Sequence, residues 1–210
     1  MYFIDFLARW AHVMFGVAWV GLLYYFNFIQ GAYFAEATAE AKADATKKLA
    51  PRALWWFRWG AMGTFLTGLY LLKVVGASAG PYLLLGATMG IFMFLNVWLI
   101  IWPKQKIVIG LKQGDVAAAA SKALLASRTN TLFSAPMLFG MIAAQHFKPL
   151  GMPAGIGSFT STGFLVALAL ILLLELNAIF GKTGPIASVK GVIHFSLALT
   201  ALLFAAVYYL

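Results

Sequence analysis

The sequence predicts an all-α integral membrane protein, a bundle of about six transmembrane helices. Of its 210 residues, 63% are hydrophobic and only 10% are charged, whereas soluble domains carry about a quarter charged residues. Six apolar stretches are also long enough to cross a bilayer, which takes about 20 residues in a helix. We therefore expect a single transmembrane domain over residues 1–210, surrounded by lipid.

The first expected span runs from about Ile4 to Gln30. The amino terminus lacks the basic segment of a cleaved signal peptide, so we expect this span to be retained. A polar, alanine-rich surface helix over Ala35–Leu49 follows, and Pro51 is expected to end it. The five remaining expected spans are Leu54–Val75, Tyr82–Trp102, Asn130–Phe147, Ser161–Phe180 and Ile186–Leu210.

Glycine and proline mark the expected turns and breaks. Pro103 is expected to stop the third span, and Pro136 to kink the fourth, which is of marginal length. Between these spans we expect an exposed, partly amphipathic connector over Lys104–Arg128. The three expected turns or loops are Gly76–Pro81, Lys148–Thr160 and Gly181–Pro185.

The distribution of basic residues predicts the topology. The formal net charge is +9, but the lysines and arginines lie in short loops, a pattern that orients helices and argues against nucleic-acid binding. The connectors after spans one, three and five hold most of them, and by the positive-inside rule both termini then face the periplasm of an inner-membrane protein. These residues are Lys42, Lys47, Lys48, Arg52, Lys104, Lys106, Lys112, Lys122, Arg128, Lys182 and Lys190.

Several kinds of chemistry are excluded by what the sequence lacks. The chain has no cysteine, which excludes disulfides, thiolate-held iron–sulfur clusters and covalently attached c-type haem. It also has no phosphate-binding glycine-rich loop, no His-Glu-x-x-His motif and no nucleophile elbow.

The three histidines are the main candidates for chemistry, because each lies within or at the end of an expected span, where polar groups are costly. With a rise of 1.5 Å per residue, His12 and His146 lie about 27 and 24 Å above the inner boundary, and His194 about 13 Å. His12 and His146 are therefore expected at matching depth near the outer surface, and His194 near mid-membrane.

A b-type haem held between two histidines is the economical use of these residues. Gly16 and Trp19 share the helix face of His12, and Gly16 leaves space beside the imidazole. We expect His12 and His146 to be the axial iron ligands, with His194 as second choice. The alanines on the face of His194 suit either a flat macrocycle or close helix packing, and the sequence does not separate these.

A second polar set lies toward the inner half of the bundle. It consists of Arg58, Asn96, Glu175, Asn177 and Lys190. Arg58 and Glu175 are each close to the inner end of a span, so they could form an ion pair. We favour a structural pair over a proton relay or a clamp on a haem propionate.

Several segments share a pattern with a known family. They are Arg9–Gly21, Trp56–Trp59 followed by Thr67–Gly68, Asn96–Trp98 followed by Trp102–Lys106, and Ser127–Asn130 followed by Pro136 and Gln145–His146. In this order they resemble the membrane domain of bacterial urate hydroxylases, the urate oxidase N-terminal domain. The setting of His12 is more loosely similar to the first helix of membrane haem-b proteins such as the protoporphyrinogen-oxidase-like family.

The resemblance implies an inner-membrane oxidoreductase that passes electrons toward a cytochrome c. The chain carries no cytochrome c segment, so we expect this partner to be a separate periplasmic protein. By position, the matching residues are His12, Arg58, Asn96, Gln105, Arg128, Asn130 and His146.

The leading hypothesis is therefore a haem b-binding electron-transfer protein of the bacterial inner membrane. Its expected cofactor-binding residues are His12, His146, His194, Gly16, Trp19 and Arg58. The alternative is a non-catalytic accessory subunit of a larger respiratory complex, which would use its helices only as scaffold.

Overall fold

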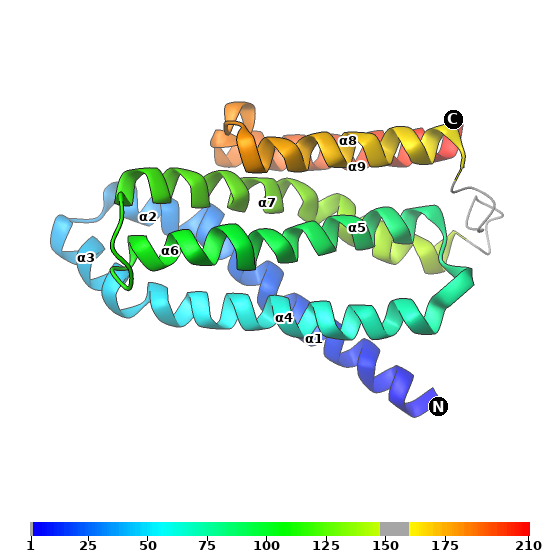
Figure 1. Cartoon of the computed structure of the whole chain (residues 1–210), viewed down its shortest axis with the longest axis horizontal. Coiled ribbons are helices and arrows are strands. Elements are labelled where there is room, and N and C mark those ends of the chain that lie inside the picture. The colour runs from blue at the N-terminus through cyan, green and yellow to red at the C-terminus, as the bar shows by residue number, and fades with distance from the viewer. Residues whose placement is uncertain (1, 148–159) are drawn as a thin grey trace.

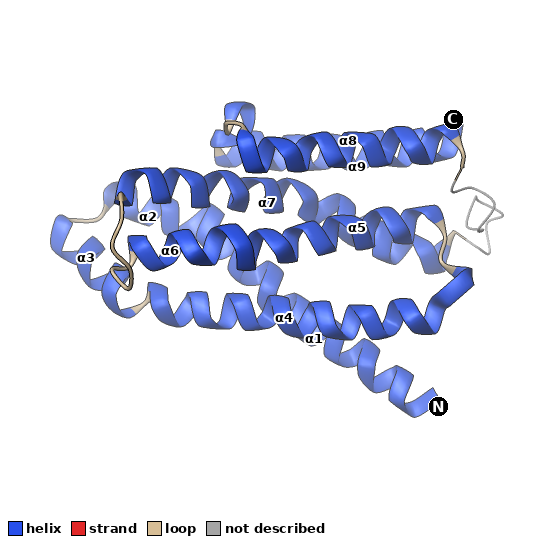
Figure 2. Cartoon of the chain, in the orientation of Figure 1, coloured by secondary structure: helices blue, strands red, loops and turns tan. Residues whose placement is uncertain are grey.

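A computed structural model describes residues 2–147 and 160–210. Within these ranges every regular element is a helix (Figure 2). The first half consists of α1 (Tyr2–Tyr24), η1 (Tyr25–Gln30), α2 (Gly31–Glu36), α3 (Ala39–Lys48), α4 (Ala50–Val75) and η2 (Gly76–Ser78). The second half consists of α5 (Pro81–Leu95), η3 (Asn96–Ile101), α6 (Trp102–Val108), α7 (Val116–His146), α8 (Thr162–Phe180), η6 (Gly184–Ala187) and α9 (Val189–Tyr209).

The long helices run side by side between two ends of the bundle (Figure 1). Both chain termini and the turn from α4 to α5 lie at one end, here called the terminal end. The opposite end carries α2, α3 and the connector from α6 to α7, and is here called the basic end because of its lysines and arginines. The amino-terminal half of α1 remains in contact with α4, through Asp5 and His12, and leaves large apolar side chains exposed.

Four segments of the described chain are long and apolar enough to cross a membrane. They are Tyr2–Glu36, Pro81–Val108, Thr162–Phe180 and Val189–Tyr209. The prediction of a helical membrane protein is confirmed at this level. The helices α4 and α7 have 26 and 31 residues but are less apolar, so their crossing of the membrane stays a prediction.

Two prolines expected to end helices lie in first turns of following helices, although the surface helix α3 does end at Lys48, just before Pro51. Pro51 lies in the first turn of α4 and Pro103 in that of α6. The first turn of a helix lacks intrahelical partners for its N–H groups, so proline costs nothing there. The third span consequently continues past Trp102 to Val108.

The connector between the third and fourth spans also differs from expectation, because α7 begins at Val116, capped by Asp115. The fourth span is therefore part of a long helix rather than a marginal one, and Pro136 lies inside it. The predicted fifth span matches α8, capped by Ser161. The expected loop over Lys148–Thr160 falls almost entirely outside the described residues.

Glycines let the helices approach closely at two crossings. A Cβ added at Gly140 of α7 would lie 2.4 Å from the Tyr82 carbonyl oxygen of α5. One added at Gly60 of α4 would lie 3.1 Å from the backbone nitrogen of Trp19 in α1. Small residues serve helix association in membranes in this way, by permitting backbone contact.

Candidate functional site

His12 lies on the side of α1 that packs against α4. Its Nδ1 is 3.0 Å from Oγ1 of Thr67, and a Cβ added at Gly68 would lie 3.0 Å from its Cε1. The absence of a side chain at Gly68 therefore lets the imidazole rest on the backbone of α4.

The hydrogen bonds of Thr67 define which nitrogen of His12 carries the proton. The single hydroxyl proton of Thr67 points to the Gly63 carbonyl at 2.6 Å, so its oxygen accepts from the Nδ1–H of His12. The Thr64 carbonyl, 3.1 Å from the same hydroxyl, is the more distant of its two possible acceptors. The lone pair of the neutral imidazole is then on Nε2, which hydrogen-bonds to none of the described residues.

This arrangement is the one that metal-ligating histidines use, because a hydrogen bond from the second ring nitrogen fixes both the tautomer and the ring orientation. Open space lies one turn further along α1, where a Cβ added at Gly16 would meet no atom within 4 Å. Trp19, in contrast, is 2% exposed and belongs to the packed seam between α1 and α4.

The other two histidines lie elsewhere. His146 is the last residue of α7, at the terminal end, and is exposed. His194 lies in the first half of α9, and its side chain is also exposed. Among the described residues, no group of three or more His, Cys, Asp or Glu side chains could hold a metal ion. A haem with two histidine ligands needs only a pair, so the expected His12–His146 pair stays a prediction.

The suggested ion pair between Arg58 and Glu175 does not form. Arg58 lies over the ring of Trp102, with its Cζ 3.9 Å from the ring centroid, while Glu175 accepts a hydrogen bond from Asn96 at 3.1 Å. The reason is helix packing: α4 packs along α1, and α8 packs along α9, so the two side chains have different neighbours. Arg58 also lies over α6 rather than beside His12.

A buried polar network joins three helices at mid-bundle. The side-chain nitrogen of Asn96 donates to Glu175 and, at 3.0 Å, to Asn130. Asn130 in turn donates to the Met93 carbonyl at 2.9 Å. All three side chains are at most 7% exposed. Polar pairing of this kind links helices where lipid offers no partner.

Two π-helical segments place asparagines against α7. Asn27 of η1 donates to Ser127, and Asn96 at the start of η3 donates to Asn130. Segments of π-helix inside α-helices frequently occur at functional sites. The sequence analysis named Asn96 and Asn130 but did not predict that they pair. The available signal was that both residues belong to the segments shared with the family.

A basic and aromatic cluster lies at the basic end of α4, η3 and α6. Lys106 approaches the Trp102 ring that Arg58 covers, with its Nζ 5.6 Å from the centroid. The rings of Trp59 and Trp98 meet edge to face at 5.7 Å beside them. Trp98 Nε1 is buried without a hydrogen-bond partner among the described residues. The cluster therefore presents hydrogen-bond donors that have no acceptor among the described residues.

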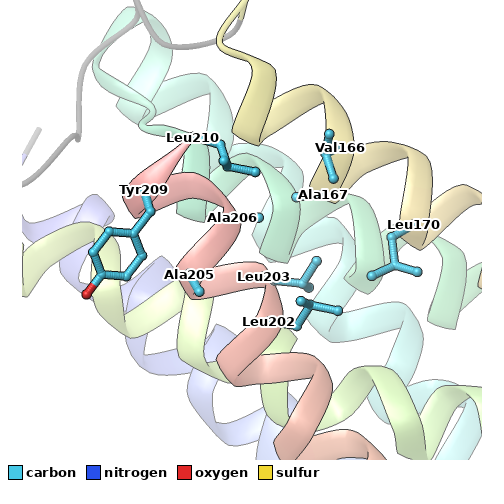
Figure 3. A pocket seen from close by; sticks show the side chains of 9 residues that line it. All are labelled: Val166, Ala167, Leu170, Leu202, Leu203, Ala205, Ala206, Tyr209 and Leu210. Carbon is cyan, nitrogen blue, oxygen red and sulfur yellow. The ribbon is translucent and has the colours of Figure 1, made fainter.

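An apolar groove of about 300 Å³ runs between α8 and α9 (Figure 3). Its lining is almost entirely aliphatic, and the ring of Tyr209 points away from α8. The lining residues are Val166, Ala167, Leu170, Leu202, Leu203, Ala205, Ala206, Tyr209 and Leu210. Such a groove offers apolar contact but no group for chemistry.

The all-helical fold, with four segments long and apolar enough to cross a bilayer, defines a helical protein of the membrane-spanning type. Comparison with known families then gives a specific relationship: the family model described as urate oxidase N-terminal matches residues 75–174. The resemblance expected from the sequence is thereby confirmed for this stretch, which includes Asn96, Arg128, Asn130 and His146. No curated protein and no solved structure matches the chain.

Proposed function

We propose that this protein is a membrane electron-transfer module that binds one b-type haem through His12. The observation that carries the proposal is the hydrogen bond from His12 Nδ1 to Thr67, which leaves the lone pair of Nε2 available. The open side of Gly16 leaves space for a flat macrocycle next to that nitrogen. The residues at this position therefore fit a haem.

The proposed second ligand is His146, with His194 as second choice. His146 is at the same end of the bundle as the amino terminus of α1, which agrees with the depth expected for the pair. Gly16 would give room to the porphyrin, and Trp19 would close the inner side of the slot. Because Arg58 contacts Trp102 instead, we do not include it in the haem site.

The bound haem would supply reversible one-electron transfer. The roles of this chain's own residues follow from their contacts: Thr67 holds the Nδ1 proton of His12, and Gly68 lets the ring approach the backbone of α4. A site near the terminal end would suit exchange with a periplasmic cytochrome c, and the family match favours an oxidoreductase.

We further propose that α4 and α7 cross the membrane, so that the bundle has six spans and periplasmic termini. Two observations support this: both termini lie at one end (Figure 1), and most basic residues lie toward the other. Positive loops stay on the cytoplasmic side of a bacterial inner membrane.

The test is a dithionite-reduced minus oxidised visible spectrum of the detergent-purified protein, with a pyridine haemochrome assay for stoichiometry. We expect a b-type α-band at about one haem per chain, lost in His12→Ala and in His146→Ala, and kept in the control His194→Ala. If His194→Ala loses the haem and His146→Ala keeps it, the second ligand is His194.

A flat spectrum from well-folded wild-type protein would contradict the haem proposal. It would favour the alternative function, an accessory subunit of a larger respiratory complex. The exposed apolar half of α1 would then be a surface for a neighbouring subunit.

A further inference from the structure

We propose that Arg58, Lys106 and Trp102 form a binding site for the phosphate of an anionic phospholipid at the basic end of the bundle. The first observation is the convergence of two cations on one ring. Arg58 Cζ and Lys106 Nζ both lie within 6 Å of the Trp102 centroid. Like charges repel, so an anion bound beside both cations lowers the energy of the arrangement.

No acidic side chain of the described residues neutralises these two cations. Among the described residues, the salt bridge that forms joins Lys48 to Asp44, and both of these residues lie on α3. The helices that form the cluster add only further positive charge, since Arg52 and Lys104 lie nearby in sequence and neither α4 nor α6 contains an Asp or Glu. The local charge is therefore complementary to an anionic ligand.

The guanidinium of Arg58 is positioned to bind a phosphate. Its Cζ lies 3.9 Å from the centroid of the Trp102 ring, a cation–π contact that holds the group in place. None of its five N–H donors makes a hydrogen bond to a described residue, so the edge remains available. A planar guanidinium held in this way binds two phosphate oxygens at once, and Lys106 adds a point charge.

The level of the cluster in the membrane identifies the source of the phosphate as lipid. Tryptophan gathers at the membrane–water interface, where headgroups lie. Five of the seven tryptophans occur in this part of the chain. The rings of Trp55, Trp56, Trp59 and Trp98 form a connected series, and Trp102 is the ring that Arg58 and Lys106 approach. Basic sites between helices on the cytoplasmic side bind anionic headgroups.

The experiment measures the melting temperature of the detergent-purified protein during titration with phosphatidylglycerol, phosphatidylcholine or inorganic phosphate. We expect phosphatidylglycerol to stabilise the wild type saturably, and the other two to have little effect at the same concentration. Arg58→Gln/Lys106→Gln should weaken the apparent affinity for phosphatidylglycerol at least tenfold. The control Lys182→Gln/Lys190→Gln removes two exposed charges at the turn between α8 and α9, and should leave the affinity for phosphatidylglycerol unchanged.

Three results would overturn the proposal. Equal stabilisation by phosphatidylcholine would show that the site does not require an anionic lipid. Equal stabilisation by inorganic phosphate would assign the site to a soluble anion. An equal loss of affinity in the control pair would show that net charge, rather than this site, attracts the lipid. The comparisons with phosphatidylcholine and with inorganic phosphate use the wild-type protein alone. They therefore test the proposal even if the double variant does not fold.

Discussion

At the scale of single residues, one threonine hydroxyl determines which nitrogen of His12 has a lone pair. Thr67 can accept from His12 because its own proton is donated to the Gly63 carbonyl. In other surroundings the imidazole could carry its proton on either nitrogen. The site proposed for haem therefore depends on a residue that would not itself touch the iron.

Thr67→Val is expected to weaken haem binding about tenfold or more, because partners that orient a metal-bound histidine typically contribute 10- to 100-fold to affinity. The measurement is titration of haem-depleted protein with haem, followed by absorbance. Thr88→Val is the matched control, since the Thr88 hydroxyl bonds only to the Leu84 carbonyl of its own helix. Unchanged affinity in Thr67→Val would show that His12 is not held by this bond when it binds haem.

Residue types and positions in the sequence indicated a polar set toward the inner half of the bundle, but not which of its members are buried or how they pair. Asn96 and Glu175 of this set are buried, whereas Asn177 and Lys190 are exposed. The ion pair suggested for Glu175 and Arg58 was wrong, because depth along two helices does not tell whether those helices touch. Pairing depends on helix neighbours, and a single sequence does not contain them.

At the scale of helices, glycine crossings determine how closely α5 and α7 approach. Gly140 and Gly86 face each other there, with a Cβ at Gly86 only 3.0 Å from the Met137 carbonyl oxygen. Gly86 and Gly90 have the Gly-x-x-x-Gly spacing of a helix-packing motif, and Gly86 is at the crossing. Gly90 has its nearest neighbour atom at 3.9 Å and tolerates a side chain.

Gly140→Ala is expected to destabilise the protein by about 1–3 kcal/mol, the usual effect of overpacking, because its Cβ would lie 2.4 Å from a backbone oxygen. Gly90→Ala should be neutral or stabilising, since alanine is the better helix former. Thermal unfolding in detergent compares the two variants. Similar melting temperatures for both would mean that the crossing readily widens.

Helix boundaries were predictable where capping residues or glycine mark them, as at Ser161 and Gly76. The end expected at Pro103 was mispredicted, because proline suits the first turn of a helix as well as the break before it. The π-helical segments were not predictable either, since they depend on the tertiary contacts that Asn27 and Asn96 make with α7.

At the scale of the whole molecule, the orientation in the membrane can be tested directly because the chain has no cysteine. Ser78, in the turn between α4 and α5, and Gln113, between α6 and α7, are both exposed and lie at opposite ends. In intact cells, we expect an impermeant maleimide to label Ser78→Cys and not Gln113→Cys. The reverse labelling would place the termini in the cytoplasm.

The central place of α7 has a consequence for assembly. This helix contacts α1, α5, α6, α8 and α9, and its residues 128–134 are buried all around. The hydroxyl, amide and guanidinium groups of these residues contact neighbouring helices. If α7 were alone in a bilayer, the same groups would contact lipid hydrocarbon. A growing chain that has reached only Phe147 lacks α8 and α9, and with them the Ser196 hydroxyl that bonds to the Leu132 carbonyl. We therefore expect α7 to enter the membrane late, accompanied by its neighbours rather than by itself.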